Sequence, residues 1–430
     1  MNFKFTHTPY VICIVMLTLT NPSYAKQWTL ESSIAQATTA SPEIKQAEAI
    51  IGERNAELEM TSLWPDPSIE LRVDNGLGLD DGSGGYDLSE VTISQAIPIN
   101  RIKHQKSVAE AHIESEKHAQ QYKILQLQHR VSKIFYELQL ASAQLELSGK
   151  RVKFADKLIT SSLKNSYGDV VRYLTPLEKM RLSIIREKAR QAETSAEGKF
   201  NEVLTEFYKV LNIAEDPALS VADLSALSLV PDLASLTELQ TKHPLLFSQQ
   251  QRLNAATNEI DVARSSATED PTISLNRSTE NFATGNEEVY GIMLNIQIPL
   301  QDRKSSAVSK ASYSASQQRI QLERMKRELQ INLNRSFTHL NHIIEQANDF
   351  NRKVLAPANE MLKLTNKGFI SGELNVLSLV DANNTYFESR IHYLDLMYQS
   401  WVELAEVNLH AGKFASTNDA TLSSYNTGGQ

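Results

Sequence analysis

The sequence repeats itself at an interval of about 200 residues, and this repeat constrains the fold more than any other feature. One stretch begins at Ser41 and its counterpart at His243. Each opens a helical pattern with a proline, Pro42 in the first and Pro244 in the second. Each pattern then gives Asp-Pro and a run of alternating apolar and polar residues. We therefore predict a duplicated unit that reads helix, strand, loop, strand and two long helices.

Two further places in the sequence support the duplication. "EVTISQAIPIN" from Glu90 matches "EVYGIMLNIQIPL" from Glu288, and both carry Ile-Pro at the end of an alternating run. "VRYLTPLEKMRL" (171–182) matches "SGELNVLSLVDA" (371–382) at nearly the same interval. The predicted organisation is a first repeat at 26–220, a connection at 221–243, a second repeat at 244–413 and a flexible polar tail at 414–430.

Four segments carry apolar residues at helical spacing over lengths that a globular domain does not need. In the first of them, Ile124, Leu127 and Val131 share one face. Sixty residues of helix reach about 90 Å, which is typical of a long coiled-coil bundle. These segments are 101–163, 177–212, 302–366 and 375–411.

Four short runs alternate apolar and polar residues and are predicted to be strands. Their length suits a tilted strand that crosses a bilayer as part of a barrel. A half-buried sheet of a soluble protein would show the same alternation, and Arg277 on the apolar face weakens the membrane interpretation. The strands are expected at 67–74, 89–98, 271–278 and 288–298, with Tyr290, Ile292, Leu294, Ile296 and Ile298 facing lipid.

The N-terminus is predicted to be a signal peptide at 1–25. Lys4 precedes an apolar run at 10–20, and "SYA" (23–25) fits a cleavage site between small residues. A retained anchor or a buried helix is the alternative. The one cysteine, Cys13, lies inside the apolar run, so the exported chain would contain none. A disulfide-free exported protein is ordinary for a bacterial envelope.

Export, the missing cysteine and the repeated hairpin together favour membrane strands over a soluble sheet. Four strands cannot close a barrel with a lumen, and open sheet edges are not tolerated in lipid. Three protomers would supply twelve strands and close it. The prolines at the strand–helix boundaries then have a role, because they end helices and bend the chain out of the sheet. These prolines are Pro67, Pro98, Pro271 and Pro299.

Several functions are disfavoured by what the sequence lacks. The net charge of −8 provides no basic footprint for nucleic acid. No phosphate-binding loop, dinucleotide fingerprint, nucleophile elbow or HExxH motif occurs, so we expect neither enzyme activity nor a cofactor. The histidine pairs His112/His118 and His339/His342 have no carboxylate or cysteine at metal-ligand spacing, so solvated helix faces are expected there.

The sequence resembles the TolC-type outer-membrane efflux factors, and among them the outer components of heavy-metal export pumps. The resemblance runs from Trp28 to Lys413. In the first inter-helix break Arg172 stands where the family's turn has glycine, and Gly168 lies four residues earlier. The stretches that carry the resemblance are "WTLESSIAQATTASPEIKQAEA", "LWPDPSIEL", "SQAIPINRIKHQ", "RVSKIFYELQLASAQLEL" (130–147) and "FISGELNVLSLVDA" (369–382).

This resemblance implies a mixed α/β membrane protein that forms a trimeric tunnel. Four strands per protomer would close a 12-stranded outer-membrane barrel, continued by a long periplasmic α-helical coiled-coil barrel. The implied partners are a periplasmic adaptor protein and an inner-membrane transporter of the resistance-nodulation-division type. The chain would conduct substrates passively to the outside, with heavy-metal cations favoured. A periplasmic aperture is expected at the two helix–turn–helix tips, with Asp169, Arg172, Tyr173, Phe369 and Glu373 as its candidate residues.

Other functions remain open at this point. The same fold could serve multidrug efflux or type I protein secretion. A periplasmic structural coiled coil with no membrane insertion is a further alternative, although it leaves the alternating apolar stripe at 290–298 unexplained.

Overall fold

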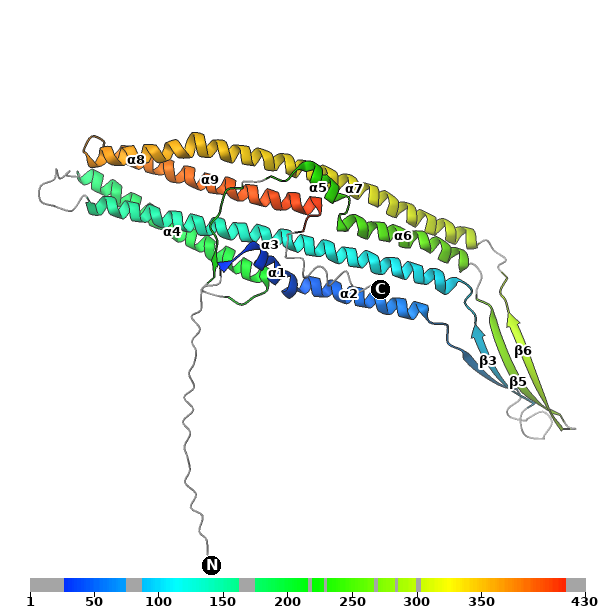
Figure 1. The fold of residues 1–430 in the computed structure, drawn as a ribbon. Coiled ribbons are helices and arrows are strands. Elements are labelled where there is room, and N and C mark those ends of the chain that lie inside the picture. Colours follow the sequence, from blue (N-terminus) through cyan, green and yellow to red (C-terminus); the bar gives the residue numbers. More distant parts are fainter. Residues whose placement is uncertain are drawn as a thin grey trace, which may run out of the picture.

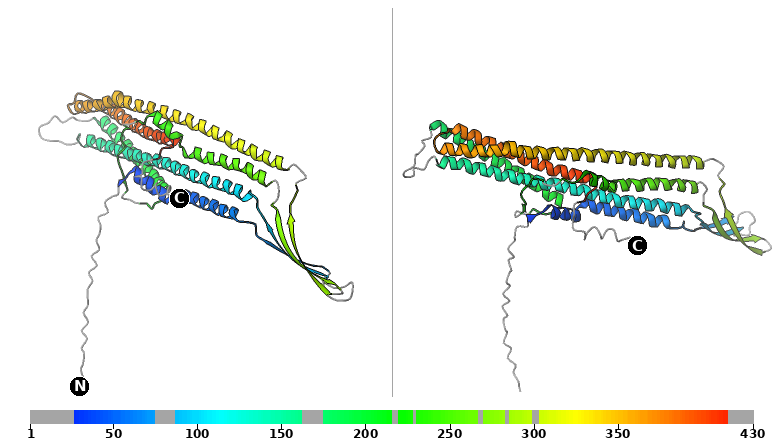
Figure 2. Two further views of the ribbon diagram at one scale, coloured as in Figure 1. Left: turned by 45° about the vertical axis from the view of Figure 1, so that its right-hand side comes forward. Right: turned by 45° about the horizontal axis from the view of Figure 1, so that its top comes forward.

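The computed structural model describes residues 27–74, 87–161, 175–215, 219–227, 230–266, 270–282, 285–298 and 303–414. The molecule is elongated, with a β-sheet at one end, long helices along its length and a helix–turn–helix tip at the other end (Figure 1). The two further views of Figure 2 show the same extended arrangement of helices that run side by side.

Long helices account for most of the described chain, and the strands occupy its short interruptions. The helices are α1 (Leu30–Ala40), α2 (Pro42–Ser62), α3 (Arg101–Ser161), α4 (Pro176–Leu211), α5 (Leu233–Gln240), α6 (Pro244–Ser265), α7 (Arg303–Phe350), the π-helical segment η1 (Asn351–Leu355), α8 (Ala356–Ile370) and α9 (Val376–Ala411). The strands are β1 (Gln27–Trp28), β2 (Ser68–Asp74), β3 (Leu88–Ala96), β4 (Ser220–Val221), β5 (Thr272–Phe282) and β6 (Gly285–Asn295).

Proline and a capping side chain set where several helices begin. Pro42, Pro176 and Pro244 occupy the first turn of α2, α4 and α6, where a missing backbone N–H breaks no helical hydrogen bond. At the start of α4 the backbone N–H of Glu178 donates to the Thr175 hydroxyl at 3.2 Å. The Thr175 backbone N–H donates in turn to the Glu178 carboxylate at 2.9 Å. This reciprocal pair satisfies two N–H groups that the first turn would leave open.

The four longer strands form one antiparallel sheet in the order β2-β3-β5-β6. The two hairpins meet at the β3–β5 pair, where Ile93 lies opposite Leu275. In the part of the chain that the structure describes, β2 pairs only with β3 and β6 only with β5, so the sheet has two open edges. Each strand overlaps its predicted segment, but β6 begins earlier and ends at Asn295, so Ile296 and Ile298 lie beyond the strand from which they were expected to face lipid. A separate two-residue parallel pair, β1 with β4, joins the start of the described chain to Ser220–Val221.

The helices next to the sheet continue the order of its strands. α2 packs on α3, α3 packs on α6, and α6 packs on α7, so α2 and α7 lie at the two edges of this layer (Figure 1). Farther from the sheet, α3 packs against α4 and α9, and α9 packs against α7 and α8. The helices next to the sheet therefore lie in the order α2-α3-α6-α7, which follows the strand order β2-β3-β5-β6.

The largest core lies where α3, α4 and α9 pack together. Phe207 of α4 and Val131 of α3 are fully buried, and Trp28 packs edge-on to Phe207 with ring centroids 6.1 Å apart. Ile124, Leu127 and Val131, which share one helical face in the sequence, are all buried in this core. Burial of one such side chain contributes about 1.5–3 kcal/mol, so the apolar stripe holds the long helices together.

The helical segment predicted at 302–366 is interrupted. Residues Asn351–Leu355 form a π-helical turn between α7 and α8. Pro357 follows in the first turn of α8, and it lacks the N–H and crowds the carbonyl of the preceding turn. A wider turn relieves that clash, so the proline accounts for the interruption.

Among the described helices, none has an apolar stretch that is long enough to cross a membrane.

Candidate functional site

One face of the sheet is apolar and exposed to solvent in the single chain. Ile69 lies opposite Ile93, Ile93 opposite Leu275, and Leu275 opposite Ile292, so one apolar row crosses all four strands. Exposure in this row reaches 81% at Ile292. An apolar patch of this extent marks a surface that contacts lipid or another protein. We call the following residues the apolar face: Ile69, Leu71, Val73, Val91, Ile93, Ile273, Leu275, Tyr290, Ile292 and Leu294.

The opposite face of the sheet is polar. The Asn276 amide donates to the Glu90 carboxylate at 2.8 Å, and the hydroxyls of Ser94 and Ser274 lie 2.8 Å apart. These bonds join β3 to β5, which come from different halves of the chain. A sheet with one apolar and one hydrogen-bonded polar face suits an apolar medium on one side and water on the other.

Arg277 is a charged residue on the apolar face, as the alternation predicts. It lies opposite Val91 and Tyr290, and its guanidinium contacts the Glu288 carboxylate at 2.7 Å. The Tyr290 hydroxyl donates to the same carboxylate at 3.1 Å. Arg277 and Tyr290 are the middle residues of β5 and β6, so this group lies halfway along the two strands. The ion pair with Glu288 offsets part of the cost of placing a charge on this face.

The junction between sheet and helices is held by bonds to proline carbonyls. The Gln95 amide donates to the Pro65 carbonyl at 2.8 Å, and the Ile97 N–H donates to the Pro271 carbonyl at 2.8 Å. Arg101, the first residue of α3, forms an ion pair with Asp270 at 2.5 Å, and the Asp270 side chain is largely buried. The contacts of Ile97 and Arg101 bind the first hairpin to the second where the chain changes from strand to helix, whereas the Gln95 bond lies within the first half of the chain.

Three of the four predicted boundary prolines lie at this junction. Pro67 directly precedes β2, Pro98 lies between β3 and α3, and Pro271 directly precedes β5. Each occupies a position outside the strand ladders, where proline removes no sheet hydrogen bond. Pro299 lies outside the described residues.

At the far end of the molecule, α8 and α9 meet in a tight turn. Gly372 has φ +84°, a conformation that favours glycine, and Glu373 beside it is exposed. Phe369 is 5% exposed and packs with Leu158 and Leu182. Its ring is therefore part of the core of this tip rather than of its surface. Asp169, Arg172 and Tyr173, the other candidate aperture residues, lie outside the described residues.

The histidine pairs are not brought into a metal site. His118 stacks on Phe247 with ring centroids 5.3 Å apart, and His339 lies 3.0 Å from the Glu403 carboxylate. Within the described ranges, no group of three or more His, Cys, Asp or Glu side chains is arranged to hold a metal ion.

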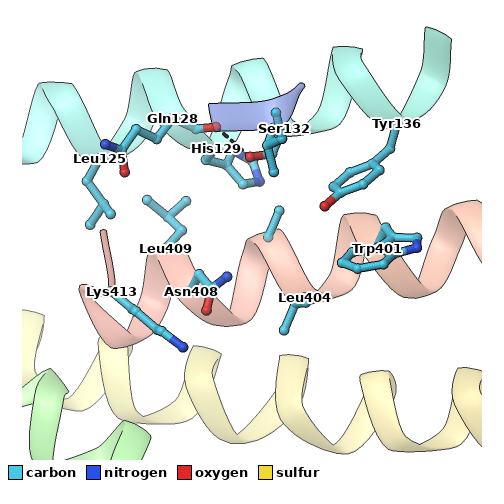
Figure 3. Close-up of a pocket in the computed structure, with 12 residues that line it drawn as sticks. Leu125, Gln128, His129, Ser132, Tyr136, Trp401, Leu404, Asn408, Leu409 and Lys413 are labelled. Carbon is cyan, nitrogen blue, oxygen red and sulfur yellow. Dashed lines mark hydrogen bonds between the residues drawn. The ribbon is translucent and has the colours of Figure 1, made fainter. Parts of the chain in front are cut away.

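A polar cluster in the middle of the helical part was missed by the sequence analysis. A cavity of about 60 Å³ lies between α3 and α9, large enough for ordered water (Figure 3). Tyr136 and Trp401 stack beside it with ring centroids 4.8 Å apart. The Ser132 hydroxyl, also in its wall, donates to the Gln128 carbonyl at 2.8 Å. The cavity therefore lies in the seam between these two helices.

Beside this cavity, Glu406 lies between two histidines. Its carboxylate oxygens are 3.0 Å from His129 Nε2 and 3.7 Å from His410 Nε2. The adjacent His129 ring holds the pKa of the Glu406 carboxyl below its usual value. Burial lowers the pKa of His410, although Glu406 acts in the opposite direction. The spacing of Glu406 and His410 on one helix was visible in the sequence, but their partner on α3 could be found only from the packing.

The second half of the chain matches a known protein family. Residues 236–412 match the family model described as outer membrane efflux protein. The cobalt-zinc-cadmium resistance protein CzcC of Cupriavidus metallidurans is 24% identical over 292 residues, which cover 68% of this chain and 66% of CzcC. Protein CyaE of Bordetella pertussis is 28% identical over 304 residues, which cover 64% of this chain and 60% of CyaE. The chain thus spans less than two thirds of the length of either relative.

The fold is that of a solved membrane channel. The crystal structure of CusC superposes with a TM-score of 0.70 at 16% sequence identity, over 90% of this chain and 92% of CusC. At this identity the likeness establishes the shared fold of helices and strands.

The two faces of β6 are expected to respond differently to the same substitution. Leu294 lies on the apolar face, whereas its neighbour Asn295 lies on the polar face. Leu294→Arg is expected to reduce stable assembly, because an arginine that faces lipid is destabilising, by up to about 4 kcal/mol at the bilayer midplane. Asn295→Arg and the control Leu294→Ile are expected to assemble normally. The amount of heat-resistant oligomer in isolated outer membranes measures this, and equal assembly of both arginine variants would show that the face assignment is wrong.

The cluster around Glu406 is expected to lose stability on acidification. The folded-state pKa of His410 lies below its unfolded value of 6.5, so its contribution is present above pH 6.5 and is lost below it. The lowered pKa of Glu406 acts in the same direction, starting below pH 4.5. His129 and Glu406 face His410, as do the charges of Arg335 and Glu403.

We expect the melting temperature in detergent to fall between about pH 7.5 and pH 5.5, and to fall less in His410→Gln. The matched control is His342→Gln on the exposed side of α7, which should keep the full pH dependence of the parent protein. Identical pH dependence in all three proteins would exclude His410 as the titrating group.

Proposed function

We propose that the chain is an outer membrane efflux protein, as the match of residues 236–412 supports, and that it forms the exit duct of a tripartite efflux system. Its location is the bacterial outer membrane, with the helical part extending into the periplasm. In the proposed system the duct passively conducts substrates that an inner-membrane transporter of the resistance-nodulation-division type delivers. A periplasmic adaptor protein connects the two.

The observation that carries this proposal is the sheet with an exposed apolar face and two open edges. In lipid, the unpaired N–H and C=O groups of β2 and β6 would have no partner. Three copies would pair β6 of each protomer with β2 of the next and close a twelve-stranded barrel. The apolar face would then contact lipid and the polar face would line a water-filled passage.

The helices extend this passage into the periplasm in the proposed trimer. α3 has 61 residues and therefore spans about 90 Å. α2, α3, α6 and α7 leave the sheet in the order of its strands, so closing the sheet also closes the layer of helices. A continuous tube from the barrel to the tip follows from this shared order.

The two halves of the chain, 26–220 and 244–413, are proposed to be structural repeats. Each supplies a helix, a hairpin and a long returning helix: α2, β2, β3 and α3 in the first, and α6, β5, β6 and α7 in the second. The segment 221–243 connects them, and 1–25 is proposed to be removed on export. The shared order of elements supports this division.

Heavy-metal cations are the proposed substrates. CzcC, with which the chain shares 24% identity, is named as a cobalt-zinc-cadmium resistance protein. A duct needs no tight metal site, because an ion that binds tightly does not leave. The proposal therefore requires only a polar, water-filled passage, for which the polar face of the sheet is suited.

The proposal is tested by mass and by metal tolerance. Native mass spectrometry of the full chain in detergent is expected to give three copies. A deletion strain should accumulate cadmium, zinc and cobalt, and the restored gene should return these levels to normal. The Leu294→Arg variant serves as the control that is made but not assembled. A stable monomer would contradict the closed barrel. If the protein is a trimer but its deletion leaves cellular metal levels unchanged, the substrates would be drugs or secreted proteins instead of metal cations.

The periplasmic tip is proposed to be an aperture that is closed at rest and opens for transport. Glu373 is exposed at the α8–α9 turn, and Asp169 belongs to the companion tip in the sequence. In a trimer each charge occurs three times around one axis, so like charges repel unless they hold cations. Replacing Asp169 and Glu373 together by Ala is expected to raise single-channel conductance or to reduce cation preference in planar bilayers. Unchanged conductance and selectivity in a normally assembled trimer would place the gate elsewhere.

A further inference from the structure

The two edges of the helical layer leave complementary surfaces without a partner in the single chain. α2 packs on α3, and α7 packs on α6 and α9 (Figure 1). The views of Figure 2 keep α2 and α7 on opposite sides of this layer. The side of each helix that faces away from its neighbours is therefore bare.

On α7 the bare side is apolar and basic. Tyr313, Ile320 and Ile331 are 74%, 67% and 58% exposed, although each is a large apolar side chain. Arg324 and Arg327 lie between them at spacings of three and four residues, which place all five on one helical face. We call these five residues the α7 stripe. Four of them, all except Tyr313, line a surface hollow of about 650 Å³, together with Arg319, Glu323 and Glu328.

On α2 the side that faces away from α3 carries small side chains and is partly apolar. Ala49, Gly52 and Ala56 recur at spacings of three and four residues, and the exposed Met60 and Leu63 continue the same side toward the sheet. A Cβ added at Gly52 would meet no atom within 4 Å. We call these five residues the α2 face. It offers room for large side chains that approach from outside.

The charges beside these two surfaces are opposite in sign. Glu53 and Glu59 flank the α2 face, and within the described residues neither forms an ion pair. Arg327 likewise has no ion pair in the described chain, whereas Arg324 forms an exposed ion pair with Glu328 at 3.6 Å. The unpaired carboxylates on one edge and the guanidinium groups on the other, of which that of Arg327 is unpaired, predict attraction between the two edges.

We propose that the α7 stripe of one copy docks on the α2 face of a second copy. Ile320 and Ile331 would cover the small residues of α2, and the arginine stems would lie across Gly52 while their guanidinium groups reach Glu53 and Glu59. This inference rests on the proposed function, because the trimer requires α7 to meet α2 of the next protomer. It adds which side chains form that contact and assigns Arg324 and Arg327 the role of setting its register.

Two arginines in an otherwise apolar seam favour this particular pairing over others. A buried or half-buried charge is tolerated only where an opposite charge meets it, so a shifted register would leave the guanidinium groups unpaired. The apolar residues of the α7 stripe contribute buried surface area to the contact but do little to select its register. The contact between the α7 stripe and the α2 face thus combines attraction with an energetic cost for any other register.

Charge reversal on the two helices tests the contact. The variant Arg324→Glu with Arg327→Glu is expected to lower the trimer-to-monomer ratio in detergent by about tenfold or more, because like charges then meet. Glu53→Arg with Glu59→Arg is expected to do the same. A chain that carries all four changes should recover trimer, which a general folding defect would not. Lys304→Glu with Lys326→Glu, exposed on other sides of α7, is the matched control and should leave the ratio unchanged.

Cysteine cross-linking provides a second measurement on the full chain. The sequence contains one cysteine, in the predicted signal peptide, so introduced cysteines act alone. Ala56→Cys combined with Ile320→Cys or with Arg324→Cys is expected to form disulfide-linked dimers and trimers on oxidation, because a disulfide requires a Cβ–Cβ distance of about 4 Å. Ala56→Cys combined with Lys326→Cys should not.

The outcomes separate this inference from the proposed function. A parent protein that is monomeric would overturn both. If the parent protein is trimeric, the charge-reversal variants remain trimeric and no cross-links form from α2 to α7, the docking contact is overturned. The proposed exit duct would be unaffected by that result. Reversal variants that keep the trimer but lose an adaptor protein would show that the α7 stripe serves that partner instead of a second copy.

Discussion

Backbone hydrogen bonding along the edges of the sheet is the constraint on which the rest of the structure depends. β2 and β6 each present a row of N–H and C=O groups that the described chain does not pair. Water could satisfy those groups, but hydrocarbon cannot, and each one left open in lipid costs several kcal/mol. A sheet whose outer surface is apolar and whose edges are open is therefore incomplete as a single copy. The proposed trimer resolves this by pairing unlike edges of identical chains.

The need to pair the two open edges of the sheet also applies to the helices, because the helices leave the sheet in the order of its strands. α2 and α7 occupy the edges of the helical layer above the edge strands β2 and β6. Whatever closes the sheet must also bring these two helices together. The exposed apolar and charged side chains on their outer sides are suited to that meeting. One symmetry operation would thus satisfy backbone groups in the membrane and side chains in the periplasm.

The proposed passive duct would make few chemical demands on its wall. Glu406 of α9, which lies between His410 of the same helix and His129 of α3, joins these two helices. The ion pair of Arg101 with Asp270 similarly joins the two hairpins at the base of the sheet. Both groups hold long elements in alignment, which the proposed tube would require along its whole length.

The sequence by itself determined the local elements and their repetition. Period-two alternation in 67–74 predicted a strand that the structure has at Ser68–Asp74, and alternation in 288–298 predicted one that it has at Gly285–Asn295. Helical spacing at Ile124, Leu127 and Val131 predicted a core face, and all three are buried. These patterns are readable because each depends on residues close together in the chain. Only the tertiary structure decided that β3 pairs with β5, that Phe369 is buried at the tip, and that Glu406 meets His129. It also placed the π-helical turn before Pro357, where the sequence pattern predicted one continuous helix. The pairing of β3 with β5 and of Glu406 with His129 joins residues far apart in the chain, and a periodic pattern records which face of a helix is buried but not which partner buries it.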